Sequence, residues 1–330
     1  MTTISVNPDT EVLLSVRNVK KYFPVKNKTL FSPPLQVKAV DDVSFDLYTG
    51  NTLGLVGESG CGKSTLGRTV LRLIEPTEGQ VLFHNQDILQ LNKEQLRKMR
   101  RYFQIVFQDP QASLNPRMTI GDMVSEPFLI QHISDKAEAK ERAKELLETV
   151  GLRSDIANRY PHEFSGGQRQ RISIARALAL NPELLVCDES VSALDVSVQA
   201  QIINMMMTLQ EKRNLTYLFI SHDLRVIRHI SNVIAVMYLG KIVELSPSEE
   251  LFQHTAHPYS LSLLSAVPTT NPEERRKHVL LSGDVPSPVN PPSGCRFHTR
   301  CPKCLNICKE EEPVLRELSP GHFCACHCPD

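Results

Sequence analysis

The chain has 330 residues, 41% hydrophobic and 22% charged, which is typical of an ordinary soluble globular protein with a sizeable core. Its 37 basic and 37 acidic residues balance, so no overall positive field indicates a nucleic-acid partner, and none is expected. The longest apolar runs, such as residues 233–239, are far shorter than the ~20 residues of a membrane-spanning helix, and residues 1–6 do not resemble a signal peptide. We therefore expect a cytoplasmic protein that reaches a membrane only through a partner.

Predicted strands and helices alternate along most of the chain. Strands are expected at 12–19, 37–47, 52–56, 103–107, 184–187 and 218–220, and a hairpin at 233–238 and 241–244 around Gly240. Helices are expected at 63–74, 135–150, 167–180 and 196–213. Residues 21–36 are predicted to form a loop, and residues 109–130, rich in Pro, Ser and Gly, to be irregular. The alternation predicts an α/β fold with a parallel sheet.

The helix at 135–150 is predicted from its periodicity and its ends. Ser134 is a candidate N-cap and Gly151 a candidate C-terminal stop. The expected buried face consists of Ala139, Ala143, Leu146, Leu147 and Val150.

The C-terminal part of the chain differs in composition. Prolines recur from Pro268 to Pro292 and predict an extended tether. Seven of the nine cysteines lie in the last 36 residues. Because a cytosolic chain rarely keeps disulfides, the cluster indicates metal ligation first.

Residues 57–64 fit the P-loop pattern G-x-x-x-x-G-K-[ST] between a predicted strand and a predicted helix. The glycines let successive N–H groups point at phosphate oxygens, and the helix N-terminus adds partial positive charge. Lys63 is expected to reach the β- and γ-phosphates, and Ser64 to bind Mg²⁺. The expected nucleotide-binding residues are Gly57, Ser59, Gly60, Cys61, Gly62, Lys63, Ser64 and Thr65.

Two acidic residues follow the buried strand at 184–187. We expect Asp188 to hold Mg²⁺, directly or through water, and Glu189 to orient or deprotonate an attacking water. An acidic pair is also common at a solvated strand end, so this prediction depends on the presence of the P-loop.

Residues 164–171, Phe-Ser-Gly-Gly-Gln-Arg-Gln-Arg, form a second candidate anion site at a helix start. Ser165 alone could be an ordinary N-cap, but that interpretation leaves the two glycines unexplained, because glycine weakens a helix. Since one P-loop already cradles the phosphates, a second cradle implies a second nucleotide.

This segment resembles the signature motif of ABC ATPases, in which two subunits pack head to tail and each signature closes on the other's ATP. The resemblance implies that Ser165, Gly166, Gly167 and Gln168 act on a partner's nucleotide. Gln108 matches the Q-loop, which contacts Mg²⁺ or the water. His222 matches the switch histidine at the γ-phosphate.

Two further matches have structural roles in the family. Asp195, in Ser192-Ala-Leu-Asp195, matches the D-loop that crosses the dimer interface. Phe23 matches the aromatic residue that stacks on adenine, and Tyr22 is its competitor. Ser190 departs from the pattern, which usually has proline there, so it is expected to loosen the turn without abolishing hydrolysis.

The resemblance implies a fold and an activity. The fold is a P-loop NTPase (RecA-like) core with an antiparallel β subdomain and an inserted α-helical subdomain at about 109–165. The nucleotide-binding domain would span 1–267, and the tether with its cysteine-rich extension 268–330. The implied activity is ATP hydrolysis, with Lys63, Gln108, Glu189 and His222 as catalytic residues.

Further segments resemble the ATP-binding subunits of dipeptide, oligopeptide and nickel importers. They are residues 107–116, His257-Pro-Tyr259 with 263–268, and 283–295. The opening at 19–24 favours the second of the two ATPases of such importers. The implied partners are a homologous ATPase in a heterodimer, two transmembrane permease subunits and a periplasmic or extracellular substrate-binding protein. The chain would lie at the cytoplasmic face of the membrane.

The cysteines Cys295, Cys301, Cys308 and Cys326 match the four-cysteine pattern of this family's extension, which implies a [4Fe–4S] cluster. Zinc is the alternative, because Cys301 and Cys304 could join Cys324 and Cys326, or His322 and His327. Unliganded thiols are a third possibility.

Two other functions compete with the transporter. A soluble ABC ATPase of translation or DNA repair usually has two fused cassettes or a long coiled coil, and this chain has neither. A purely regulatory nucleotide binder would not need Glu189 and His222. The transported solute is not encoded in this chain, so peptides and nickel or related solutes both stay open.

Overall fold

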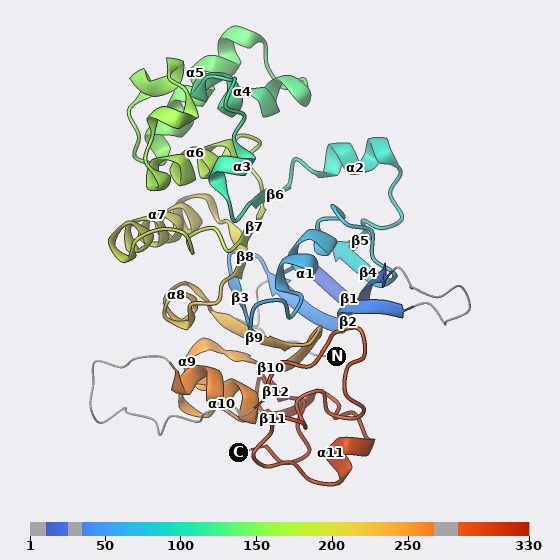
Figure 1. Ribbon diagram of the computed structural model, residues 1–330. Coiled ribbons are helices and arrows are strands. Elements are labelled where there is room, and N and C mark those ends of the chain that lie inside the picture. Colours follow the sequence, from blue (N-terminus) through green and yellow to red (C-terminus); the bar gives the residue numbers. More distant parts are fainter. Residues whose placement is uncertain (1–10, 26–34, 267–282, 330) are drawn as a thin grey trace. The chain divides into compact units, whose positions relative to one another are not determined.

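The computed structural model describes residues 11–25, 35–266 and 283–329 (Figure 1). The chain forms two compact units. The first is built from the segments Met1–Tyr48, Thr52–Leu89 and Ser221–Asp330, and the second from Thr49–Asn51 and Gln90–Ile220. In the described segments, no helix combines the length and the apolar character needed to cross a membrane.

An antiparallel sheet in the first unit has the order β2-β1-β4-β5. Its strands are β1 (Val12–Val25), β2 (Leu35–Tyr48), β4 (Glu78–Phe83) and β5 (Gln86–Asp87). This sheet confirms the expected antiparallel part of the fold. The loop predicted at 21–36 is wrong at both ends, because β1 and β2 stay paired from Lys21–Val40 to Val25–Leu35. Pro24 is tolerated because β4 pairs with β1 only as far as Lys20, which leaves one side of the strand open.

Five strands of a second sheet lie in this unit, in the order β11-β12-β10-β9-β3. They are β3 (Thr52–Val56), β9 (Val233–Tyr238), β10 (Lys241–Pro247), β11 (Arg316–Ser319) and β12 (His322–Cys324). The strands β3 and β9 are parallel, and the other pairs are antiparallel. The hairpin around Gly240 is confirmed, and β11 and β12 extend the same sheet.

The described residues of the first unit include five α-helices. They are α1 (Lys63–Val70), α8 (Leu224–Ile230), α9 (Ser248–Gln253), α10 (Pro258–Ser265) and α11 (Ile307–Glu310). The helix predicted to run from 63 to 74 ends earlier, because Arg72 adopts a left-handed conformation (φ 49°) and the Leu73 N–H bonds back to the Arg68 carbonyl at 2.9 Å.

The second unit pairs three parallel strands in the order β8-β7-β6 with a group of helices (Figure 1). The strands are β6 (Phe103–Val106), β7 (Leu184–Asp188) and β8 (Thr216–Ile220). Its α-helices are α2 (Lys93–Met99), α3 (Pro110–Ser113), α4 (Ile120–Ile130), α5 (Lys136–Thr149), α6 (Gly166–Leu178) and α7 (Val196–Arg213). Two 3₁₀ turns, Ser154–Asn158 and Pro161–Glu163, connect α5 to α6.

The prediction that residues 109–130 are irregular is wrong. Asp109 caps α3 and Thr119 caps α4, each through its side chain. Helix α4 buries Ile120, Met123, Val124 and Phe128, a helical spacing. Pro127 lies inside this helix, and it is one of the Pro, Ser and Gly residues whose content made the segment look irregular.

The helix predicted at 135–150 is present, but its cap is Asp135 rather than Ser134. The Asp135 carboxylate accepts hydrogen bonds from Ala137 N (2.8 Å) and Glu138 N (2.9 Å). A cap at Asp135 satisfies two helix N–H groups at once, which explains why the helix begins one residue later. The five residues predicted for its apolar face are all buried.

The proposed division between residues 267 and 268 falls outside the described residues, as do Pro268 and Pro272 of the tether. Residues 283–329, including the cysteine-rich extension, belong to the first unit.

Candidate active site

The P-loop joins β3 to α1 within the first unit. At Gly62 the backbone has φ 109°, and an added Cβ would lie 1.9 Å from the Ala39 carbonyl oxygen. At Gly57 the φ angle is 154°, and a Cβ would lie 2.1 Å from the Met237 carbonyl oxygen. Both positions therefore require glycine. The turn is therefore packed closely against the backbone at Ala39 and Met237.

Lys63 is the first residue of α1 and is 4% exposed. Its Nζ donates to the carbonyls of Gly57 (2.8 Å) and Glu58 (3.0 Å), so the ammonium lies inside the turn. The N-cap of α1 is Gly62, which has no side chain and so makes no side-chain cap bond. A buried cation at a helix N-terminus is suited to bind a polyphosphate.

The carboxyl end of β7 brings two predicted residues together in the second unit. Asp188 is fully buried as the last residue of the strand. Glu189 follows it with a left-handed backbone (φ 44°) and accepts a hydrogen bond from Gln108 Nε2 at 2.9 Å. The sequence prediction thus placed Gln108 and Glu189 at one site although they are 81 positions apart.

The other predicted residues lie in separate places. His222 is exposed between β8 and α8 and belongs to the first unit with the P-loop, whereas Gln108, Asp188 and Glu189 belong to the second. Ser59 and Gly60 are exposed on the P-loop, and Ser64 and Thr65 are half-buried in α1. Cys61 is 5% exposed, and burial raises the pKa of its thiol.

The signature segment begins α6. Ser165 Oγ accepts from Gln168 N at 3.3 Å, and Gln168 Oε1 accepts from Ser165 N at 3.0 Å, which forms a capping box. Gly167 also has a packing reason, because a Cβ there would lie 2.4 Å from Val198 Cγ1 of α7. Packing against α7 therefore explains one of the two glycines without a ligand. Ser165 and Gln168 are nonetheless exposed, so their outer surface can meet a partner.

Asp195 caps α7 and is exposed. Its carboxylate accepts from Val198 N (3.0 Å) and Ser197 Oγ (2.8 Å), and these hydrogen bonds lower its pKa. The preceding turn is closed by Ser192, whose N–H and Oγ both donate to the Glu189 carbonyl at 3.2 and 2.9 Å.

The two aromatic candidates of β1 have different surroundings. The Tyr22 hydroxyl donates to Asp41 Oδ1, and burial first and this hydrogen bond second raise its pKa. Phe23 lies under the Lys21 ammonium, 4.9 Å from the ring centre. Consecutive strand residues point to opposite faces, so only one of the two rings can face a given ligand.

Known proteins match both the cassette and the extension. The ABC transporter family matches residues 40–192, and the family "Oligopeptide/dipeptide transporter, C-terminal region" matches residues 243–308. The chain is 58% identical to the oligopeptide transport ATP-binding protein AppF of Bacillus subtilis (strain 168), covering 96% of this chain and 97% of that one. It is 53% identical to a putative peptide import ATP-binding protein of Brucella ovis, with 95% and 97% covered.

The fold has solved counterparts. A dimeric structure of a post-hydrolysis state of the ATP-binding cassette MJ0796, bound to ADP and Pi, shares 29% identity with a TM-score of 0.64 and covers 71% of this chain and 98% of that one. The structure of cbiO1 from Clostridium perfringens, at 24% identity and a TM-score of 0.63, shares the fold over 73% of this chain and 91% of that one.

The fold and the P-loop site define an ABC ATPase, an enzyme that hydrolyses ATP. Within that class, the chain belongs to the family of oligopeptide transport ATP-binding proteins that carry the oligopeptide/dipeptide C-terminal region.

The cysteines predicted as cluster ligands line one cavity of the extension. Cys295, Cys301, Cys308 and Cys326 contribute to it, together with Cys328, His327 and His257. Burial, followed by the neighbouring thiols, raises the pKa of Cys295 to about 11, although a backbone hydrogen bond from Phe297 opposes this. The buried Nε2 of His257 finds no hydrogen-bond partner in the described part of the chain. These cysteines and histidines therefore share one cavity lining.

A single metal ion is a different case. Within residues 11–25, 35–266 and 283–329, no three His, Cys, Asp or Glu side chains converge closely enough to hold one ion. One member of the zinc alternative is also engaged elsewhere, because His322 Nε2 lies 2.8 Å from Glu244 Oε1. A four-iron cluster is wider than a single ion, so its thiolates stand farther apart than zinc ligands do.

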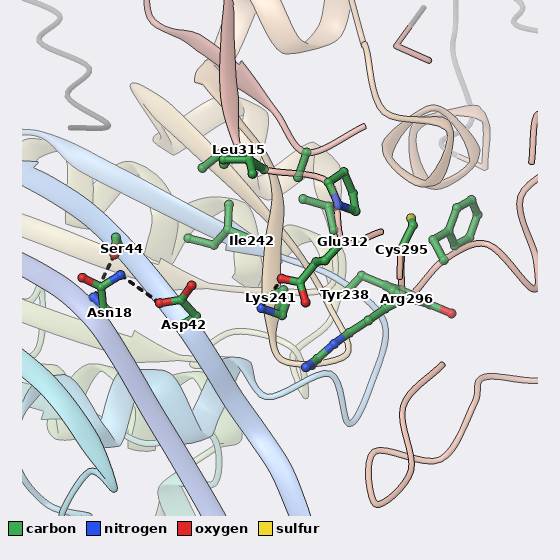
Figure 2. Close-up of a pocket in the computed structure, with 15 residues that line it drawn as sticks. Asn18, Asp42, Ser44, Tyr238, Lys241, Ile242, Cys295, Arg296, Glu312 and Leu315 are labelled. Atoms are coloured by element: carbon green, nitrogen blue, oxygen red, sulfur yellow. Dashed lines mark hydrogen bonds and ion pairs between the residues drawn. The ribbon is translucent and has the colours of Figure 1, made fainter. Parts of the chain in front are cut away.

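A second cavity, of about 400 Å³, lies between β2, β10 and the extension (Figure 2). Lys241 pairs with Glu312 at 2.5 Å on one side of it, and Asn18 donates to Asp42 at 2.8 Å on the other. Cys295 and Arg296 lie on its wall.

Sequence reasoning missed several residues of the P-loop and its surroundings. Glu58 occupies a variable position of the motif, and Arg296 and Arg300 lie between cysteines that drew attention to metal binding. Tyr259 was noted only as part of a family segment. Tyr259 and Arg300 contact Glu58 across 201 and 242 positions, and Arg296 contacts Leu239 across 57 positions, which no local pattern indicates.

Proposed function

We propose that this chain is the ATP-hydrolysing subunit of an importer that takes up dipeptides or oligopeptides across the cytoplasmic membrane. One observation carries the proposal: the likeness to proteins named for peptide transport extends over at least 95% of the chain and includes the C-terminal region.

The predicted site residues have distinct roles in hydrolysis. Lys63 and the P-loop N–H groups bind the β- and γ-phosphates, and Phe23 or Tyr22 stacks on adenine. Glu189 holds the attacking water and accepts its proton, with its carboxylate oriented by the Gln108 amide. His222 contacts the γ-phosphate. Ser64, Gln108 and Asp188 would hold Mg²⁺, which would supply neutralisation of the phosphate charge.

The exposed signature residues act on a second nucleotide. Ser165, Gly166, Gly167 and Gln168 close over the ATP of a homologous partner ATPase, and Asp195 lies at the interface with that partner. The solved relative in dimeric form with ADP and Pi supports this arrangement. A heterodimer is proposed because the opening of the chain resembles the second of two ATPases.

The remaining partners are membrane proteins and a solute receptor. Two permease subunits hold the ATPase pair at the cytoplasmic face, and ATP-driven closure and reopening change the permeases between two states. A substrate-binding protein delivers the peptide.

The domain division proposed from sequence places the cassette at 1–267 and the extension at 268–330.

The cysteine cavity is proposed to hold a [4Fe–4S] cluster through Cys295, Cys301, Cys308 and Cys326. When bound, such a cluster can add folding energy or respond to redox state. The shared cavity and the unpartnered His257 Nε2 support it. Iron and acid-labile sulfide in brown purified protein are expected, and colourless protein containing zinc would contradict the assignment.

The decisive experiment is purification of the full chain with its associated subunits, followed by ATPase measurement in vesicles. Two permeases, a second ATPase and ATP hydrolysis stimulated by a peptide-loaded binding protein are expected. Stimulation by a nickel-loaded binding protein and not by peptides would move the assignment to a nickel or other small-solute importer. Absence of permeases would favour a soluble ABC ATPase.

A further inference from the structure

Arg300 of the cysteine-rich extension contacts the second residue of the P-loop. Its Nη1 and Nη2 atoms donate to Oε2 and Oε1 of Glu58 at 2.8 and 3.1 Å. The two side chains are 7% and 24% exposed, so the pair is largely shielded from water. Two parallel hydrogen bonds fix both the distance and the orientation of a carboxylate.

The backbone of Glu58 is held as well. Its N–H donates to the Tyr259 hydroxyl of α10 at 2.8 Å. Tyr259 is fully buried, and its ring packs against Phe297 of the extension with 5.4 Å between the ring centres. Glu58 is thus fixed at its carboxylate and at its amide by residues far along the chain.

Arg296 fixes the other end of the P-loop through a turn. Its guanidinium donates to the Leu239 carbonyl and to Asp41 Oδ2. Gly240, which follows Leu239 in the chain, donates its N–H to the Cys61 carbonyl of the P-loop at 2.9 Å. Figure 2 shows the Arg296 side chain outstretched from its backbone beside Cys295.

The charge of Glu58 explains why this support is needed. A carboxylate in a loop that binds phosphates repels them unless a cation neutralises it and holds it aside. Arg300 does both, because its fork occupies both carboxylate oxygens. Ordering the loop in advance also removes part of the entropy cost of binding.

We propose that Arg300 is a positioning residue for ATP. Through Glu58, and with Arg296 supporting the loop near Cys61, the cysteine-rich extension holds the P-loop in its phosphate-binding conformation. The inference rests on the proposed assignment of the P-loop as the nucleotide site.

The test is a double-mutant cycle on the full chain, with affinity measured by titration of a fluorescent ATP analogue. Arg300→Gln is expected to raise the Kd about tenfold, a typical coupling between linked sites. Adding Glu58→Gln is expected to recover most of the loss, because the freed carboxylate is what opposes phosphate binding. In steady-state hydrolysis, Arg300→Gln raises KM for ATP and leaves kcat within about twofold.

Two further variants keep the test sharp. Arg300→Lys keeps the charge but loses the fork, so an intermediate Kd is expected even if Arg300→Gln folds poorly. Arg153→Gln, which removes an exposed pair with Asp155 (2.6 Å), is the matched control and is expected to bind like the wild type.

The opposing outcomes are distinct. An Arg300→Gln protein with a wild-type Kd, or a double variant that recovers nothing, overturns the role of Arg300. Lys63→Met is expected to abolish binding of the analogue. If Lys63→Met binds normally, the proposed nucleotide site itself is wrong, whatever Arg300 does.

Discussion

Glu189 combines an unusual backbone with a proposed catalytic role. A left-handed conformation at a non-glycine residue is costly, and such conformations gather at functional sites. Here it follows directly from the last residue of β7, and the Glu189 N–H remains bonded to the Ile220 carbonyl of β8 at 3.0 Å. The carboxyl end of the sheet therefore fixes the backbone position from which the Glu189 side chain projects.

Removing the charge of Glu189 tests its role. Glu189→Gln is expected to lower ATP turnover by about 100-fold or more, because an amide cannot accept the proton of the attacking water. ATP binding is expected to persist, so the nucleotide stays trapped and unhydrolysed. Turnover in the assembled complex is the measurement, with Glu145→Gln on the exposed face of α5 as control. Unchanged turnover would exclude Glu189 as the base.

Substitutions at two glycines of the P-loop distinguish a steric clash from a strained backbone conformation. Gly62→Ala places a methyl group 1.9 Å from the Ala39 carbonyl, whereas Gly60→Ala meets nothing within 4 Å although its φ is 78°. Thermal unfolding is expected to show a large loss of stability for Gly62→Ala and a loss of about 1 kcal/mol for Gly60→Ala. Equal losses would mean that only the backbone conformation matters.

At the scale of elements, local signals predicted some helices well and missed others. Helix α7 occupies the predicted residues 196–213, because its cap and its C-terminal stop are both local. Helix α4 was missed because the segment's content of Pro, Ser and Gly was given more weight than its apolar spacing, which tertiary burial makes helical. The site motifs were predictable for the same reason as α7, since each is a short segment with its own chemistry.

The cap of α5 gives a matched pair of variants. Asp135→Ala is expected to lower the free energy of unfolding by about 1 kcal/mol, because two N–H groups lose their acceptor. Ser134→Ala, one residue earlier, is expected to change it by much less. Denaturant unfolding of both variants makes the comparison, and the reverse order would restore Ser134 as the cap.

At the scale of the molecule, an ion pair joins the cysteine-rich extension to β2. Arg296 and Asp41 are 255 positions apart, and both are nearly buried. Burial alone would raise the pKa of Asp41, but the hydrogen bond from Tyr22 and the Arg296 charge outweigh it and leave the pKa lowered. Sequence patterns could not predict this contact, because neither residue belongs to a motif.

The lowered pKa of Asp41 has a consequence for acid stability. A depressed carboxyl pKa contributes stability above the unfolded value of about 3.9, and this contribution is lost as the pH falls through the folded value. The difference in unfolding free energy between wild type and Asp41→Asn is therefore expected to be largest near neutral pH and to shrink below about pH 4. A difference that does not vary with pH would contradict the ion-pair role.

The strand β12 makes a segment far along the chain from the P-loop sensitive to truncation. Glu244 is fully buried in β10 and accepts hydrogen bonds from Ala256 N (2.7 Å) and His257 N (3.1 Å), while His322 of β12 lies against its Oε1. A nonsense codon after Pro320 would delete β12 and leave this carboxylate without its imidazole. The shortened product is expected to melt at a lower temperature and to be degraded in cells, although its entire ATPase cassette would have been translated.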